Sequence, residues 1–125
     1  MIGLARIRGQ DRALELLRKA LESERVPHAY LFAGPSGVGK TSAARIIRHT
    51  LGCSRLDFRE LNCADFRGID MVRGLRETAP LAPQQGNARV WIIDEVHRVT
   101  GEASDAMLKL LEDPPDHAYY ILCTT

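Results

Sequence analysis

The segment from Gly34 to Thr41 fits the pattern G-x-x-x-x-G-K-T and constrains the fold of this chain more than any other. An apolar run, residues 29–33, precedes it, and residues 42–47 follow with helical spacing. Glycines let backbone N–H groups approach a phosphate closely, and the helix that follows points its positive dipole end at the same place. A strand, a glycine-rich loop and a helix in this order therefore predict a phosphate-binding loop rather than a turn that binds nothing.

The motif also predicts roles for single residues. The Lys40 ammonium can reach the β- and γ-phosphates of a nucleotide, and the Thr41 hydroxyl can ligate Mg²⁺. The backbone N–H groups of the loop would surround the β-phosphate. The predicted nucleotide-binding residues of the motif are Gly34, Pro35, Ser36, Gly37, Val38, Gly39, Lys40, Thr41 and Ser42.

The composition limits the class of protein. The chain has 125 residues, of which 45% are hydrophobic and 26% charged, and this suits one soluble domain with its own core. A net charge of +1 does not indicate a nucleic-acid binder, although it leaves a local basic face open. No apolar run is long enough to cross a membrane and no signal peptide is visible, so we expect a cytoplasmic protein without membrane contact.

The cysteines and histidines indicate no metal centre. Cys53, Cys63 and Cys123 include no C-x-x-C pair, and their odd number argues against a disulfide framework. We therefore expect no zinc. The four histidines lack ligand spacing, and His97 is expected to be a loop residue. Trp91 and the tyrosines near the end of the chain are expected in the core.

Apolar periodicity predicts strands and helices in alternation. Strands are expected over residues 29–33, 57–62, 89–94 and 119–123. Helices are expected over residues 10–21, from about 40 to 51, 69–78 and 102–112. Four such repeats imply a parallel α/β sheet flanked by helices, with the whole of residues 1–125 in one domain.

Two acidic residues, Asp94 and Glu95, directly follow the most apolar predicted strand. Parallel sheets collect ligands at the carboxyl ends of their strands, so Asp94 is expected beside the phosphate loop, where it can hold Mg²⁺. Glu95 is placed to deprotonate the water that attacks the γ-phosphate. Thr124 and Thr125 end the last predicted strand, and either could sense that phosphate.

At this point the chain resembles the AAA+ clamp-loader ATPases, which include the bacterial DNA polymerase III tau/gamma subunit and the small subunits of replication factor C. The resemblance rests on residues 25–32 before the phosphate loop, on Asp-Glu-Val-His at 94–97, and on residues 106–115. Residues 60–65 and 67–73 are more similar to replication factor C. The fold implied is a P-loop NTPase of the AAA+ class, a three-layer parallel sheet flanked by helices.

The resemblance implies ATP and Mg²⁺ as cofactors, with Lys40 and Thr41 on the phosphates and metal, Asp94 on the metal and Glu95 as the catalytic base. It makes Thr125 the first sensor, with Thr124 as the alternative. It also implies a polar switch that restrains the catalytic Glu, a pair of residues near adenine, and several partners. These are Asn62 for the switch, Arg8 and Val26 near adenine, and other clamp-loader subunits, a sliding clamp and primer–template DNA as partners.

The chain departs from the family pattern in three places. The interval from Cys53 to Asp57 is too short for the tau/gamma zinc module, and the Arg-Pro-rich opening before Gly9 is missing. The sequence ends at the first sensor, so we expect a fold truncated after the fourth core strand, without arginine finger, lid or collar. Residues 29–33 would then form an open sheet edge, and the chain alone would be poorly soluble and a weak ATPase.

Other functions stay open at the level of sequence. The chain could be a nucleotide-binding interaction module with negligible ATPase activity, or part of another AAA+ DNA-processing motor. DNA contacts are expected from a few arginines, each of which could equally be a solvated surface residue. These arginines are Arg67, Arg73, Arg76 and Arg98.

Overall fold

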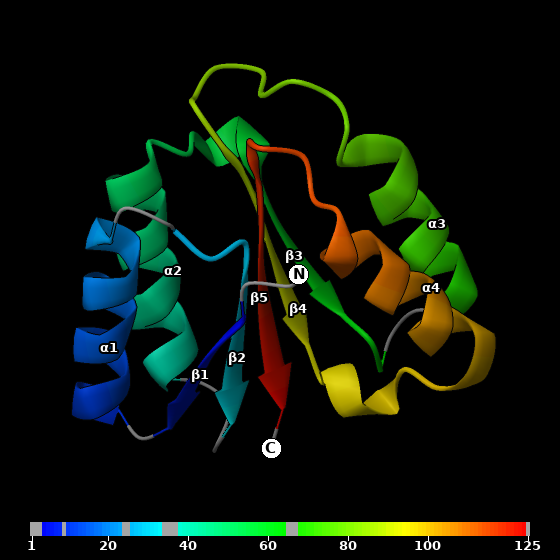
Figure 1. Ribbon diagram of the computed structural model, residues 1–125, viewed down its shortest axis with the longest axis horizontal. Helices are drawn as coiled ribbons and strands as arrows, with labels where there is room; N and C mark the ends of the chain where they lie inside the picture. The colour runs from blue at the N-terminus through cyan, green and yellow to red at the C-terminus, as the bar shows by residue number, and fades with distance from the viewer. Residues whose placement is uncertain (1–3, 9, 24–25, 34–37, 65–67, 125) are drawn as a thin grey trace.

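The computed structural model describes residues 4–8, 10–23, 26–33, 38–64 and 68–124. Five parallel strands form one sheet in the order β1-β2-β5-β4-β3. All five strands run in the same direction in Figure 1, with their carboxyl ends along the lower edge. The strands are β1 (Leu4–Arg8), β2 (Ala29–Ala33), β3 (Phe58–Asn62), β4 (Arg89–Asp94) and β5 (Ala118–Thr124).

Helices cover both faces of the sheet and make three layers. Figure 1 shows α1 and α2 side by side on one side of the sheet and α3 with α4 on the other. Each face has its own buried cluster: Leu17, Ile47 and Ile92 belong to the α1–α2 side, and Val72, Met107 and Ile93 to the α3–α4 side. The helices are α1 (Gln10–Glu22), α2 (Val38–Leu51), α3 (Gly68–Thr78) and α4 (Gly101–Glu112).

This architecture confirms the expected three-layer α/β fold, and most element bounds agree with the sequence prediction to within two residues. β4 is buried over its first five residues, as a central strand covered on both faces must be. The strand expected over residues 57–62 differs slightly from this prediction. Arg55–Asp57 forms a 3₁₀ turn, η1, and β3 begins only at Phe58.

The outermost strand on one side of the sheet differs from the expectation. β1 pairs with β2 in parallel from Leu4–Ala29 to Arg8–Ala33, so β2 lies between β1 and β5. The prediction that residues 29–33 form an open edge was wrong. The structural reason for expecting poor solubility therefore no longer applies. The sequence prediction missed this strand because Leu4–Arg8 holds two arginines in five residues and so lacks the apolar pattern of a buried strand. A strand at the edge of a sheet tolerates such charges.

Two buried charged side chains close the amino-terminal edge of the sheet. Asp57 is only 1% exposed and accepts hydrogen bonds from the Ser54 hydroxyl and from the N–H groups of Gln85 and Gly86, at 2.7, 3.1 and 3.0 Å. The N–H of Gln84 donates a fourth. Arg89 is also buried, and its guanidinium donates to backbone carbonyls of the loop that follows α3, including that of Leu81 at 2.8 Å and that of Ala82 at 3.0 Å.

Hydrogen bonds set the charge state of Asp57. Burial by itself would raise the pKa of this carboxyl, but the donors from Gly86, Gln84, Ser54 and Gln85 outweigh it and hold the pKa well below its usual range. Asp57 is therefore a buried anion that ties η1 to the loop before β4.

Candidate functional site

The carboxyl ends of four strands bring the predicted site residues to one edge of the sheet. Register pairs place Ala33 beside Thr124 and Asn62 beside Asp94. β5 lies between β2 and β4, so the end of β2 is separated from Asp94 by a single strand. This is the edge at which a parallel α/β sheet holds its ligands.

The helix α2 begins at this same edge, at Val38, and its backbone includes Gly39, Lys40 and Thr41. No acidic residue occupies its first turn, so the positive end of the helix dipole is not offset by a carboxylate of its own. Ser42 is half-buried in the second turn. The side chains of Lys40 and Thr41 lie outside the described part of the structure, as do the residues 34–37, Thr125 and the side chain of Arg8.

Asp94 ends β4 and is half-exposed. Its Oδ1 accepts a hydrogen bond from the Glu95 N–H at 2.9 Å, and its backbone carbonyl accepts one from the Cys63 N–H at 3.0 Å. The first contact fixes the carboxylate against the turn that follows, and the second joins that turn to the end of β3. Asp94 is thus held at the strand end with part of its carboxylate reachable by solvent.

Glu95 has a left-handed backbone conformation, with φ 56° and ψ 39°. A residue with a Cβ seldom adopts this conformation, and such strain often accompanies a functional turn. The strained residue lets the chain turn sharply out of β4 into the 3₁₀ turn η2 (Val96–Arg98). Its side chain is 25% exposed, and Oε2 lies 3.1 Å from Arg98 Nε and 3.7 Å from His97 Nε2.

His97 joins this turn to β5, because its Nδ1 lies 3.0 Å from the Thr124 hydroxyl oxygen. Its two ring nitrogens therefore face Thr124 on one side and Glu95 on the other. Sequence reasoning gave His97 no role, since a contact across 27 residues leaves no local signal. Only the Asp-Glu-Val-His order could have drawn attention to it.

Asn62 lies at the end of β3, as predicted, and its side-chain oxygen accepts a hydrogen bond from the Ala64 N–H at 2.9 Å. This is a local cap on the turn after the strand. Val26 is half-buried and packs against the α1–α2 cluster. The switch role of Asn62 and the adenine role of Val26 stay predictions.

Cys63 lies next to this edge but is not a reactive thiol. Burial raises the pKa of Cys63, and the negative charges of Asp94 and Glu95 raise it further. Its Sγ lies 3.7 Å from Met71 Sδ, within the α3–α4 cluster. Cys53 and Cys123 are likewise buried and unbridged, so the three cysteines behave as small core residues.

The described residues contain no group of three or more His, Cys, Asp or Glu side chains that could hold a metal ion. Asp94 lies at the carboxyl edge of the sheet and could contribute one oxygen ligand to a metal ion, and the sequence predicts the Thr41 hydroxyl as a second. Two protein oxygens suit Mg²⁺, which keeps waters and substrate phosphates as its other ligands. In the same described part, no helix is long and apolar enough to span a membrane.

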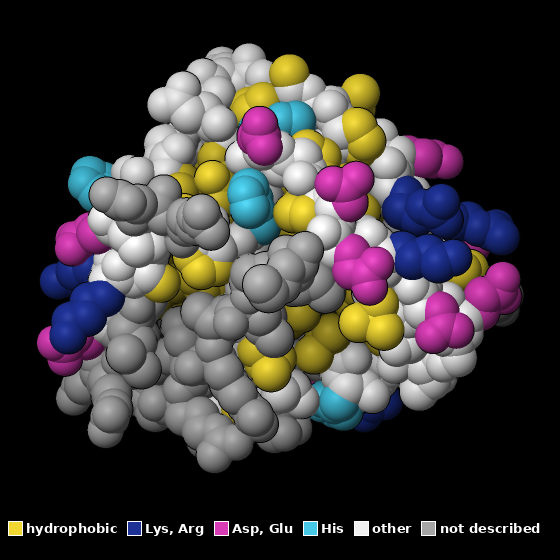
Figure 2. Space-filling model, in the orientation of Figure 1, with side chains coloured by type: hydrophobic (Ala, Val, Ile, Leu, Met, Phe, Trp, Pro, Cys, Tyr) yellow, Lys and Arg dark blue, Asp and Glu magenta, His cyan; other side chains and the backbone are white. Residues whose placement is uncertain are grey.

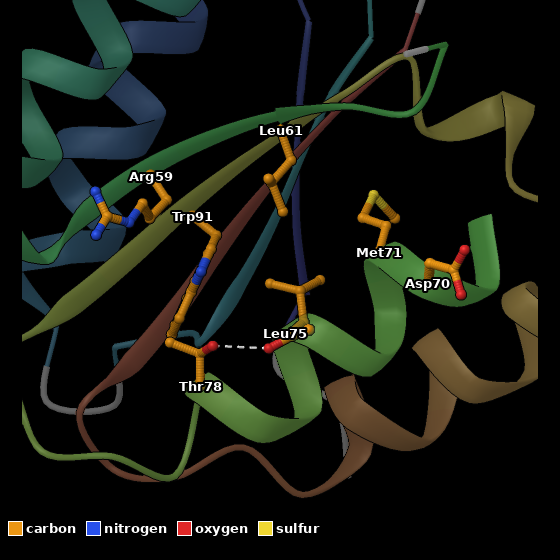
Figure 3. A pocket seen from close by; sticks show the side chains of 8 residues that line it. Arg59, Leu61, Asp70, Met71, Leu75, Thr78 and Trp91 are labelled. Atoms are coloured by element: carbon orange, nitrogen blue, oxygen red, sulfur yellow. Dashed lines mark hydrogen bonds between the residues drawn. The ribbon is translucent and has the colours of Figure 1, made fainter. Parts of the chain in front are cut away.

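A hollow of about 320 Å³ opens between α3 and the β3–β4 face of the sheet. Figure 3 shows Trp91 and Leu75 facing it, while the Thr78 hydroxyl donates to the Gly74 carbonyl at 2.7 Å. It contains none of the residues predicted for the nucleotide site. Its lining is Arg59, Leu61, Asp70, Met71, Gly74, Leu75, Thr78 and Trp91.

The family model described as "DNA polymerase III, delta subunit" matches residues 9–71 and 64–125. This chain belongs to the DNA polymerase III clamp-loader family. A curated relative, the DNA polymerase III subunit gamma/tau of Mycobacterium tuberculosis strain H37Rv, is 38% identical over 144 residues, covering 97% of this chain and 25% of the relative. The tau subunits of Bacillus subtilis and Escherichia coli are 36% and 34% identical, each covering 94% of this chain and 24% and 22% of their own lengths.

This chain therefore spans about a quarter of the length of these relatives. The matched stretch of 144 residues is longer than the 125 residues of this chain, so the relative carries extra residues within it. A gamma subunit-related protein of DNA polymerase III from Thermotoga maritima has the same fold, with a TM-score of 0.71 and 23% identity. That match covers 89% of this chain and 38% of the other.

Proposed function

We propose that this chain forms the ATP-binding and hydrolysing core of a clamp loader that places a sliding clamp on primed DNA. One observation carries the proposal. The Asp94–Glu95 turn lies at the same sheet edge as the start of α2, with only β5 between their strands. Phosphoryl transfer needs this juxtaposition of a phosphate cradle and metal-binding and water-orienting carboxylates.

In this proposal the motif from Gly34 to Ser42 holds the nucleotide phosphates, and Lys40 supplies the positive charge. The Thr41 hydroxyl and Asp94 would hold Mg²⁺, which would supply positive charge against the phosphates when bound. Glu95 accepts the proton of the attacking water. Thr125, or Thr124 in its place, contacts the γ-phosphate, and Arg8 lies near adenine.

The proposed partners are other clamp-loader subunits, the sliding clamp and primer–template DNA, in the cytoplasm. Two arginines offered as DNA contacts, Arg73 and Arg76, are exposed on α3. Asp70 and Glu77 are exposed on the same helix, and Figure 2 shows basic and acidic side chains intermingled over it. On a surface where both charges occur, the acidic side chains offset part of the attraction of the arginines for the phosphate backbone of DNA. Arg67 lies outside the described residues.

The second candidate function is a nucleotide-binding module with negligible ATPase activity. It is favoured by the ion pair between Glu95 and Arg98, because a paired carboxylate is hindered as a base. The third, another AAA+ DNA-processing motor, is disfavoured by the clamp-loader relatives over nearly the whole chain. The first two functions share nucleotide binding and differ in turnover.

Nucleotide binding is tested by titrating a fluorescent ATP analogue into the protein with Mg²⁺. Lys40→Ala should weaken binding at least tenfold, because it removes the positive charge aimed at the phosphates. Lys19→Ala is the matched control: Lys19 is exposed on the last turn of α1, 3.8 Å from Glu15, far from the carboxyl edge. Equal affinities for wild type, Lys40→Ala and Lys19→Ala would remove the phosphate-loop assignment.

A further inference from the structure

The side chain that follows the Asp-Glu pair by three residues contacts the proposed base directly. Arg98 Nε lies 3.1 Å from Glu95 Oε2, and the Arg98 backbone N–H donates to the Glu95 carbonyl at 3.0 Å. Both contacts close within η2, so they need no support from distant parts of the chain. Figure 2 shows a basic side chain next to a histidine at the lower edge, where Figure 1 places η2.

Both contacts of the Glu95 side chain within the described residues converge on Oε2. Arg98 donates to this oxygen, and His97 Nε2 lies 3.7 Å from it. A carboxylate accepts a proton from water through an oxygen lone pair, in a geometry that must suit the attacking water. A guanidinium on Oε2 occupies one of those lone pairs and fixes the rotamer of the side chain.

The pair is also easy to break. The Arg98 side chain is 59% exposed and makes a single Nε–H···O bond rather than a bidentate one. Exposed pairs of this kind contribute little to stability, since water competes for both partners. A restraint this weak can hold Glu95 in most molecules and still release it without a change of fold.

We infer that Arg98 is a positioning residue that restrains Glu95 in an unproductive orientation and thereby slows ATP turnover in the resting protein. The inference rests on the proposed function, because it assigns Glu95 the role of base. His97 is the second member of the restraint and carries it to Thr124 at the end of β5.

The first test needs no nucleotide. The Arg98 Nε–H signal, assigned by its disappearance in Arg98→Lys, should exchange with solvent more slowly in the wild type than in Glu95→Gln, because the amide replaces the charged acceptor. Arg55 gives a matched reference, since it is an exposed arginine in the other 3₁₀ turn. Equal exchange at Arg98 in both proteins would overturn the inference, whatever the protein does with ATP.

The second test measures ATP turnover. Arg98→Ala should raise basal turnover about two- to fivefold, the range expected when a weak exposed ion pair is released. Arg98→Lys keeps the charge without the guanidinium and should fall between wild type and Arg98→Ala. Arg55→Ala should leave turnover unchanged.

The two proposals fail in different ways. The inference about Arg98 is overturned if ATP turnover is equal in wild type and Arg98→Ala, at zero or at any other level. It is also overturned if turnover is lower in the variant. Failure of the nucleotide-binding function would appear instead in the titration of Lys40→Ala. A protein that binds ATP through Lys40 but ignores Arg98 would keep the proposed function and lose this inference.

Discussion

Two carboxylates stand beside two 3₁₀ turns at opposite edges of the same sheet, and they differ in nearly every physical respect. Asp57 closes η1 at the amino edge, is 1% exposed and accepts four hydrogen bonds, three of them from backbone N–H groups. Glu95 precedes η2 at the carboxyl edge, is 25% exposed and meets the exposed side chains of His97 and Arg98 through one oxygen. The backbone of Glu95 is strained.

The difference agrees with a structural role for Asp57 and with the chemical role proposed for Glu95. A buried carboxylate that accepts four hydrogen bonds cannot leave its partners without a large loss of free energy, so its role is to stabilise the fold. A half-exposed carboxylate with replaceable partners can exchange them for a metal ion or for water, including the water that attacks a phosphate. Strain held at such a residue is a further sign of function.

The largest expected effect belongs to Glu95→Gln. The amide keeps the size of the side chain but cannot accept a proton from water, so ATP turnover with partner subunits and primed DNA should fall about 10²-fold or more. Nucleotide affinity and the free energy of unfolding should stay close to wild type, since the Glu95 side chain is partly exposed and its ion pair with the exposed Arg98 side chain is weak. Equal turnover by Glu95→Gln and wild type would refute the base assignment.

Asp57→Ala should instead damage the fold. It leaves the N–H groups of Gln84, Gln85 and Gly86 without their acceptor and opens a buried polar gap. We expect a loss of about 3 kcal/mol in the free energy of unfolding, measured by urea denaturation. Asp57→Asn keeps an acceptor oxygen and should lose less. If the alanine variant unfolds like the wild type, the amino edge is not held as described.

Close backbone packing at the same edge gives the next effect. A Cβ at Gly86 would lie 2.3 Å from the Gly52 carbonyl oxygen and 2.7 Å from the Ser54 N, so Gly86→Ala must shift backbone. We expect it to cost about 1–3 kcal/mol of stability. Gly74→Ala is the matched control, because nothing lies within 4 Å of its Cβ and a helical Gly→Ala change stabilises by about 0.5–1 kcal/mol. Equal midpoints for the two variants would contradict the close packing.

The smallest effect is a pH dependence. The pKa of Asp57 is lower in the folded protein than the value of about 3.9 in unfolded chains, so its contribution is complete above that value and is lost as the pH falls toward the folded pKa. Between pH 7 and pH 3 the loss should reach about 1 kcal/mol. The difference in stability between wild type and Asp57→Asn should shrink by this amount, and a constant difference would show that Asp57 is not the titrating group.

The order of the elements could be predicted because each leaves a local pattern. The apolar run of β4 and the motif at the start of α2 are recognised from a few neighbouring residues. The position of Asp94 and Glu95 at the end of a strand could be predicted in the same way. β1 could not be found, since a short strand with two arginines is recognised only by its pairing with β2. The same holds for the His97–Thr124 contact and for the three backbone donors to Asp57, which join residues far apart in sequence.

The central claim is that the carboxyl edge of the sheet binds the nucleotide and the amino edge only holds the fold. Amide chemical shifts recorded while ATP and Mg²⁺ are titrated into ¹⁵N-labelled protein test both halves at once. We expect large changes at the first turn of α2 and at Asp94, Glu95 and Thr124, with none at residues 54–57 and 84–86. Changes confined to the amino edge, or to the Trp91 hollow beside α3, would contradict it.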